Sequence, residues 1–530
     1  MNKHINFDMS GNFIGDIVDY VSREYLDKGR ALDRIAFVFE GKRPSLFLKK
    51  ALSERIGRPY SAPISFSIEE FVKYVLLKKT DIADLPAMET YYTIYKTAKA
   101  LKAGLVKKRE KFSEFLPWAR EAAAFIDLLD LEDIEPEKLS NIQASATIGF
   151  DVPDNINALL KNITLIRDAY HKTLLEKKMF SRGFKYLSAA RAINEIKFDE
   201  FDVVIFAGFF FMHKTVSDII GGVCGQGKGV LINNGDQGSG FRVQGSLSEV
   251  RRPACTLPDK TNDQRLTTND QRSLRLYAAF DKHSQVCLAR EILKNVDDLS
   301  DTVIVLPDPD SMIPLVSELG GQFGDFNVSL GYPLKRSSLY SLFEHVFRAQ
   351  KTKKNGEYYS KDYLAALSQP IMKNLRIAEN PAVTRIIVHK IEEALLGTES
   401  AGINNSIFLS LDDVLEDEKL FKALEAALNE AGEKIGEGAI KAILEKLHRL
   451  LFGLWENIES FRELAAALDE FLAEVIARSK LEEYPINIKI AQRLYSLKEE
   501  FENASFSAEH FEKEDIFKLF RGIVENEILA

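Results

Sequence analysis

The chain has 530 residues, of which 45% are hydrophobic and 28% charged, and its formal net charge at pH 7 is −9. This composition excludes disordered and fibrous classes, and the length predicts two to four domains because a single core stops growing near about 300 residues. The acidic balance excludes a surface coated with phosphate contacts, so any binding of nucleic acid requires a local basic patch.

Strand-like and helix-like segments alternate in two parts of the first half. "RIAFVFEG" at 34–41 is a short apolar run rich in aromatic residues, and "SLFLKKALSERIG" at 45–57 has helical spacing with a Gly stop. "DVVIFAG" at 202–208 and "GVLINNGD" at 229–236 are two further strands around the short helix "TVSDIIGGV". Continuous apolar strands that alternate with helices indicate a parallel sheet covered on both faces.

Helical spacing dominates residues 67–195, where three segments carry apolar residues three and four positions apart. Residues 237–273 are polar and irregular and contain the near-duplicate "TNDQRLTTNDQR". We interpret this part as a surface loop, because repeat folds need several units of about 20 to 50 residues.

The second half begins with "DTVIVLPDPDSMIPLVSELG" at 301–320, which predicts a strand, a turn and a helix. After about residue 370 the spacing becomes helical. Ser410 with Asp413 predicts a capping box. Two apolar stripes, at 440–455 and 461–475, are typical of the core of a helical bundle.

The order of these segments resembles one known family. The pieces that carry the likeness are the strand followed by "GKRPSLF", the helical "FSEFLPWAREAAAFIDLLDLEDIEPEKLSN", then "FDVVIFAGFFF", and the "VIVLP" segment with "NVSLGYPL". From about residue 10 to 370 the chain is similar to the N-terminal, helicase-like part of AddB-type proteins, which act in AddAB- and RecBCD-like repair of double-strand breaks. It resembles especially the variants whose ATPase motifs have decayed.

The resemblance implies an α/β fold with two RecA-like parallel-sheet domains, the second incomplete, and large all-helical insertions. Residues 1–66 and 200–281 would form the first RecA-like domain, with 67–199 as its insertion. Residues 282–370 would begin the second domain, and 371–530 would be a helical insertion or bundle. The PD-(D/E)XK nuclease motif of the family is not visible, so we expect a fragment that lacks the nuclease domain.

Active members of the family carry a P-loop after the first strand, where backbone N–H groups and a Lys converge on the phosphates. This chain reads "FDMSGNFIGDIVDYV" there, with Gly11 and Gly15 but no Gly-Lys-Ser or Gly-Lys-Thr. We therefore expect no ATP hydrolysis, no cofactor, nucleotide or metal site, and no catalytic residue. The predicted function is an ATPase-inactive part that holds or guides DNA and scaffolds a nuclease and a motor partner. The alternative is a scaffold that binds protein partners and no nucleic acid.

Two basic stretches are candidate DNA contacts. Lys42 and Arg43 lie on the loop from a strand into a helix, where basic side chains and helix N–H groups can meet a phosphate. The stretch at 96–111 supplies six more candidates, which are Lys96, Lys99, Lys102, Lys107, Lys108 and Arg109. The alternatives are a solvated turn at Pro44 and a charged solvent face.

Other motifs are weaker. "GGVCGQGKGV" at 221–230 resembles a P-loop sequence, but it lies after a helix and before a strand. A P-loop lies after a strand and before a helix, which is the order that directs backbone N–H groups at a phosphate. We interpret this stretch as a helix stop and a turn with Lys228 solvated at its tip. The acids of "DLLDLEDIEPE" at 127–137 are interpreted as solvated residues at a helix end.

The histidines and cysteines are spaced unlike those of a metal site or a disulfide framework. The eight His residues show no metal-ligand spacing, and the three Cys residues form no C-x-x-C pair. Unpaired cysteines favour a reducing cytoplasm, and the longest apolar run, "VVIFAGFFFM", is far shorter than the about 20 residues that span a bilayer. We expect a cytoplasmic protein that does not span a membrane.

Overall fold

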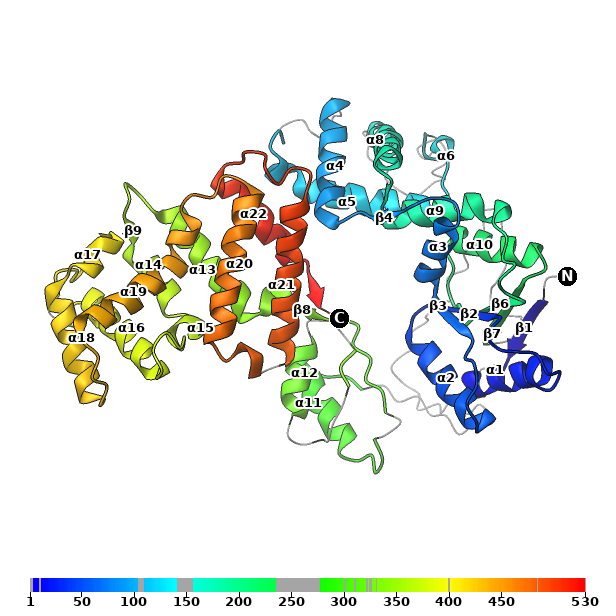
Figure 1. Cartoon of the computed structure of the whole chain (residues 1–530), viewed down its shortest axis with the longest axis horizontal. Helices are drawn as coiled ribbons and strands as arrows, with labels where there is room; N and C mark the ends of the chain where they lie inside the picture. The colour runs from blue at the N-terminus through cyan, green and yellow to red at the C-terminus, as the bar shows by residue number, and fades with distance from the viewer. Residues whose placement is uncertain are drawn as a thin grey trace. The chain divides into compact units, whose positions relative to one another are not determined.

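The computed structural model of the chain describes residues 3–8, 11–102, 109–140, 156–234, 277–299, 302–308, 311–320, 323, 327–329, 331–398, 401–483 and 485–529. The chain divides into two compact units, the first made of Met1–Val243 with Asn503–Ser507 and the second of Gln244–Glu502 with Ala508–Ala530. Figure 1 shows a parallel sheet in the first unit and a mainly helical second unit.

A five-stranded parallel sheet forms the centre of the first unit. In spatial order its strands are β1 (Lys3–Phe7), β7 (Gly229–Asn234), β6 (Val203–Ala207), β2 (Ile35–Phe39) and β3 (Ile64–Ser67). Every residue of β2 and β6 is buried, as expected for parallel strands that are covered on both faces. The predicted α/β fold with a parallel sheet is thus confirmed.

Successive residues of a strand point to opposite sides of the sheet, so both faces of this apolar sheet need a covering layer. Helices supply that layer on each face. Phe37 and Ile205 belong to the core under the first face, and Val38 and Phe206 to the core under the second. The helices of the first face are α1 (Phe13–Val21) and α2 (Arg43–Ile56), and those of the second are α3 (Ile68–Leu77), α9 (Arg182–Ala192) and α10 (Lys214–Gly225). A π-helical turn, η1 (Ser22–Leu26), extends α1.

The chain between α3 and β6 is largely helical. Its further elements are β4 (Ala83–Asp84), α4 (Ala87–Ala100), α5 (Phe112–Leu131), α6 (Pro136–Ser140), α8 (Ile156–Lys177), β5 (Met179–Phe180) and η3 (Ile193–Glu195). Residues 503–507 also belong to this unit. Phe506 is fully buried there, with its ring 4.3 Å from that of Tyr92.

The second unit consists mostly of helices. They are α11 (Lys282–Leu293), α12 (Met312–Leu319), α13 (Ser338–Thr352), α14 (Ser360–Leu367), α15 (Pro370–Lys373), α16 (Pro381–Leu395), α17 (Leu411–Leu415), α18 (Glu418–Glu430), α19 (Glu437–Leu451), α20 (Phe461–Arg478), α21 (Pro485–Asn503) and α22 (Lys513–Val524). Short helices are η5 (Leu334–Arg336), η6 (Gly453–Trp455) and η7 (Leu481–Glu483). Strand pairs of two residues each join β8 (Tyr332–Pro333) to β11 (Ile528–Leu529) and β9 (Tyr358–Tyr359) to β10 (Phe408–Leu409).

One predicted strand is wrong and one predicted cap is confirmed in this unit. Residues 302–306 form no strand, and the described part of the unit holds no sheet beyond the two-residue pairs. A strand exists only where a neighbour satisfies its backbone, and local sequence cannot supply that neighbour. Helix α17 begins with the capping box of Ser410 and Asp413, as predicted.

The core of the second unit is aromatic. The apolar stripes predicted for α19 and α20 are buried, including Leu444 and Leu468, both with no exposed surface. Trp455 and Phe471 place their rings within 6 Å of Phe343. These residues bury large apolar areas, which is the main favourable term in folding.

A buried polar pair lies beside this core. The Tyr363 hydroxyl and Nε2 of His448 are 2.7 Å apart, and Nδ1 of His448 has no hydrogen-bond partner among the described residues. Burial lowers the pKa of His448 to about 4. The imidazole is therefore neutral in the folded protein at neutral pH.

This burial predicts acid sensitivity of the second unit. The unfolded chain takes up a proton on His448 near its ordinary pKa of 6.5, whereas the folded chain does so only near pH 4. Stability is therefore full above about pH 6.5 and falls as the pH drops toward 4, losing about 2 kcal/mol between about pH 7.5 and about pH 5. His448→Gln keeps a partner for Tyr363 and should flatten this dependence. Urea unfolding, followed by Trp455 fluorescence in a Trp118→Phe background, measures the slope, and an unchanged slope contradicts the assignment.

Candidate functional site

Strands β2 and β6 are neighbours in the sheet. After each of them the chain runs toward the opposite end of the strand order. From β2 the chain passes through α2 to β3 on one side, and from β6 it passes through α10 to β7 on the other. Helices α2 and α10 also lie on opposite faces of the sheet. In open parallel sheets, ligands bind outside the carboxyl ends of strands at such a reversal.

The two loops at this reversal carry exposed aromatic and basic side chains. Phe39 and Ala207 are register partners at the carboxyl ends of β2 and β6, so the loops start side by side. Phe210 and Phe211 are 65% and 69% exposed, and Phe47 in the first turns of α2 is 62% exposed. We call the following residues the switch-point surface: Lys42, Arg43, Leu46, Phe47, Phe210 and Phe211. The structure thus places Lys42 and Arg43, predicted as DNA contacts, at this edge of the sheet.

The backbone of the β6–α10 loop explains why its phenylalanines face outward. Gly208 has φ +75°, and a Cβ there would lie 3.2 Å from the ring of Phe13. Its N–H donates to the carbonyl of Ile232, and Phe209 is buried in the core. The loop is held by these two residues, which leaves the next two side chains outside the core.

Lys42 forms an ion pair with a carboxylate of helix α3. Its Nζ lies 2.8 Å from Oε1 of Glu70, in the first turn of α3. Glu70 also accepts from the N–H and hydroxyl of Ser67 in a capping box. The Lys42 ammonium and the Ser67 N–H lower the pKa of Glu70, and Glu70 raises the pKa of Lys42. A phosphate at Lys42 would have to compete with this carboxylate.

The start of α10 is fixed by the end of α5. Oε1 of Glu132 lies 2.6 Å from Nδ1 of His213, and its Oε2 accepts from the N–H of Lys214. The hydroxyl of Thr215 donates to the carbonyl of Leu131 over 2.8 Å. The ring of Phe211 meets that of His213 edge to face. The helical segment therefore orients the loop that carries the exposed phenylalanines.

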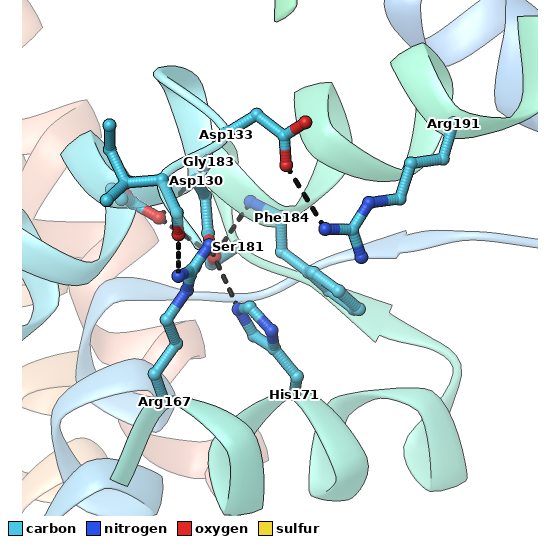
Figure 2. A network of polar contacts seen from close by, with 10 residues as sticks. Asp130, Asp133, Arg167, His171, Ser181, Gly183, Phe184 and Arg191 are labelled. Carbon is cyan, nitrogen blue, oxygen red and sulfur yellow. Dashed lines mark hydrogen bonds and ion pairs between the residues drawn. The ribbon is translucent and has the colours of Figure 1, made fainter. Parts of the chain in front are cut away.

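A buried polar network lies deeper in the same helical segment (Figure 2). Asp130 has no exposed surface, and its carboxylate accepts from Nε of Arg167 at 2.7 Å and lies 2.8 Å from Nε2 of His171. Arg167 also donates to the carbonyl of Ile134. The ring of His171 stacks on that of Phe184, 4.1 Å between centroids. The network ties α5 to α8 and α9.

Asp127 completes this network one turn earlier. Its Oδ1 accepts from the Ser181 hydroxyl and the Gly183 N–H, both at 2.9 Å. Burial raises the pKa of Asp127, against the effect of these two donors. The interpretation of the acids at 127–137 as solvated is wrong for Asp127 and Asp130, because their partners lie far along the chain.

The second predicted basic stretch lies on α4 and the residues after it. Nζ of Lys96 and of Lys99 lie over the rings of Tyr92 and Tyr95, and the guanidinium of Arg109 lies 4.6 Å from the centroid of Trp118. We call Lys96, Lys99, Lys102 and Arg109 the α4 basic face. Lys107 and Lys108, also predicted as DNA contacts, lie outside the described residues.

The P-loop-like stretch is a helix-to-strand turn, but Lys228 is not solvated. Gly227 has φ +73° between α10 and β7, and Gly229 lies against Cys224, where a Cβ would be 2.6 Å from Sγ. Nζ of Lys228 donates to the carbonyl of Phe201 over 2.7 Å. The prediction of a solvated tip is therefore wrong, since the ammonium closes the preceding loop onto the sheet.

The loop after β1 has no arrangement suited to phosphate among its described residues. The side chain of Asn12 caps α1 by accepting from the N–H of Gly15 at 3.1 Å. Asp16 lies in the first turn, where its negative charge opposes an anion at the helix N-terminus.

In comparisons with known proteins, no family model matches the chain and no curated protein is similar enough to count as a relative. Within the described ranges, no helix has the length and apolar character needed to cross a membrane. The same residues contain no group of three or more His, Cys, Asp or Glu placed to hold a metal ion.

The buried network predicts a sharp difference between neighbouring acids. Asp130→Asn leaves the Arg167 guanidinium buried without its counter-ion and should cost about 3 to 5 kcal/mol of unfolding free energy. Asp133 pairs with the exposed Arg191 and has φ 45°, which Asn tolerates. Asp133→Asn should therefore change stability by about 1 kcal/mol or less. Urea titration followed by circular dichroism compares the two, and equal effects would contradict the role of burial.

Proposed function

We propose that this chain is the ATPase-inactive, helicase-like part of an AddB-type protein of DNA double-strand-break repair. It would hold or guide DNA in the cytoplasm and scaffold a nuclease and a motor partner. In this proposal the five-stranded sheet is the first RecA-like domain, and α11 with α12 begins a second, incomplete one. DNA and a helicase or nuclease subunit would be its partners.

The observation that carries the proposal is the switch-point surface. Phe47, Phe210 and Phe211 are exposed at the sheet edge where ligands bind, and Lys42 and Arg43 start the adjoining helix. Every base offers a ring face that can stack on an aromatic side chain, and cations attract the phosphate backbone. Exposed aromatic residues beside cations therefore suit a strand whose bases are unpaired.

The α4 basic face supports the same proposal. Lys96 and Lys99 lie one turn apart on α4, and both are exposed. Cations that are one helical turn apart can contact successive phosphates of a nucleic-acid backbone. Such a local patch is what an acidic chain needs in order to bind nucleic acid.

The loop after β1 supports a role without ATP hydrolysis. Asn12 occupies the N-terminus of α1, and Asp16 in its first turn repels phosphate. Binding would then depend on surfaces and not on a nucleotide cycle.

A scaffold that binds proteins and no nucleic acid is the second candidate. The net charge of −9 favours it, as do the exposed side chains of Val303 and Val305 in the second unit. DNA titration separates the two candidates.

Binding to single-stranded, forked and blunt duplex DNA at several salt concentrations tests the first candidate. Replacing Phe210 and Phe211 by Ser should weaken single-strand binding by about 1 to 3 kcal/mol for each stacked base that is lost. Lys42→Glu, Arg43→Glu and Lys107→Glu should each lower the salt slope by about 1. Fluorescence anisotropy of labelled oligonucleotides measures both effects.

The matched control replaces two other exposed apolar residues, Leu165 and Leu175 of α8, by Ser. This change should leave DNA affinity unaltered. Affinity without any salt slope, together with no effect of the three Glu variants, would remove the DNA-holding function and leave the protein scaffold.

The ion pair of Lys42 predicts a gain of affinity. Glu70→Gln keeps the capping box, because Gln serves at that helix position as Glu does, and it releases Lys42 for a phosphate. Affinity should rise, because a phosphate at Lys42 no longer competes with the Glu70 carboxylate. Glu54→Gln is the control, since it removes the same charge from the exposed Lys50–Glu54 pair on α2. Equal effects of the two variants would show that only net charge matters.

A further inference from the structure

Trp118 lies on the outer side of α5. Its side chain is 38% exposed, whereas Phe115 and Leu116 before it are buried in the core of the helical segment. The chain has one other tryptophan, Trp455, which is fully buried in the second unit. An indole offers the largest ring face of any side chain, and part of this one is accessible to a ligand.

A cation covers part of the indole. The guanidinium of Arg109, which precedes α5, lies 4.6 Å from the centroid of the Trp118 ring. A guanidinium is planar and is held on an aromatic face by the negative charge of that face. A nucleobase is also planar and stacks on the same kind of face, and at an exposed site stacking of a base is the stronger of the two contacts. A base can therefore replace the guanidinium on the indole.

Hydrogen bonds join this place to the α4 basic face. Nζ of Lys99 donates to the Tyr95 hydroxyl over 3.1 Å, and that hydroxyl donates to the carbonyl of Glu110 over 2.5 Å. Because Glu110 follows Arg109 directly, Lys99 is held close to the residue next to the cation on the indole. The ring of Tyr95 packs on that of Phe115, with centroids 5.7 Å apart. One basic and aromatic surface thus spans the end of α4 and the start of α5.

Cations outnumber acids on this surface. The described residues 96–102 and 109–118 contain five Lys or Arg and two Glu. Within the described ranges, Lys99 and Lys102 form no ion pair with a carboxylate. The charge of these two lysines is therefore not neutralised by a neighbouring acid. An anionic ligand is favoured at such a place.

We propose that Trp118 is the residue on which the α4 basic face stacks an unpaired base. The occupant is a single-stranded nucleic acid. One base lies on the indole, Arg109 moves from the ring to a phosphate, and Lys99 contacts another phosphate. Within a duplex the bases are stacked on one another and cannot lie on the indole. This inference rests on the DNA-holding function proposed above, and it adds a contact outside the switch-point surface.

Tryptophan fluorescence reports the contact directly, because the other tryptophan is buried. An oligothymidylate of about 12 nucleotides should quench the emission of the purified chain. An abasic strand of the same length keeps the phosphates but has no bases. It should leave the emission unchanged and bind at least about fivefold more weakly.

Two substitutions of Trp118 separate stacking from other effects. Trp118→Phe should keep most of the affinity for the oligothymidylate, since a phenyl ring also stacks, and should abolish the quenching. Trp118→Ala should weaken binding of the oligothymidylate at least about fivefold. Its urea midpoint, compared with that of the unaltered chain, shows whether it is folded. If Trp118→Ala lowers the midpoint, the loss of quenching with retained binding in Trp118→Phe decides the test.

Two other variants serve as controls. Leu128→Ala replaces another exposed apolar residue of α5 and should bind and be quenched as the unaltered chain is. Arg109→Ala removes one phosphate contact and should lower the salt slope by about 0.7, the value for one contact to a single strand, while quenching persists.

Three outcomes would contradict the inference. Binding of the oligothymidylate without quenching, or unchanged affinity in a folded Trp118→Ala variant, overturns it and leaves the DNA-holding function in place. Absence of binding to every DNA tested removes both. Quenching by polyglutamate equal to that by the oligothymidylate also overturns it, since the occupant would then be an acidic polypeptide.

Discussion

The first unit depends on one constraint, which is that β2 and β6 are buried on both faces. A strand in this position can contribute only apolar side chains, and its polar backbone must be paired on both edges. Helices cover each face, and the chain leaves β2 toward one face and β6 toward the other. The reversal of connections at their carboxyl ends follows from this. At that edge the loop after β6 carries the exposed side chains of Phe210 and Phe211.

The helical segment is joined to this sheet through buried acids at the end of α5. Asp127 and Asp130 fix α8 and α9 to α5, and Glu132 fixes the start of α10. A buried carboxylate with an Arg partner contributes little net stability compared with apolar packing, but removing either partner is costly. These contacts hold the helices in the arrangement that the structure shows. The position of the β6–α10 loop is thereby set by residues that lie over 70 residues earlier in the chain, as Glu132 and His213 illustrate with a separation of 81.

The sequence predicts the central strands well and the edges poorly, for a physical reason. "RIAFVFEG" and "DVVIFAG" read as strands because burial on both faces makes every residue apolar. β1 and β3 are the outer strands of the sheet and consist mainly of exposed and half-buried residues, so their apolar signal is weaker than that of the central strands and does not reveal them. The acids of α5 are misjudged for a related reason. Their partners Arg167, His171 and Gly183 are 37 to 56 residues away along the chain. Local spacing cannot show which polar residues will meet in the interior.

At 302–306 the sequence predicts a strand that the structure does not form. The reason bears on how exposed apolar residues should be interpreted. The β-branched residues of this segment have the local preference of a strand, yet pairing is a property of two segments and not of one. The exposed phenylalanines of the switch-point surface and the exposed valines of this segment also differ in the charged residues near them in the sequence. Aromatic rings at the switch-point surface lie beside cations, whereas the valines lie in an acidic stretch. Stacking beside cations suits the anionic ligand with ring faces that we propose for the switch-point surface. Exposed aromatic residues and exposed aliphatic residues on different units would suit different ligands, so the two proposed functions, nucleic-acid binding and protein scaffolding, need not exclude each other in one chain.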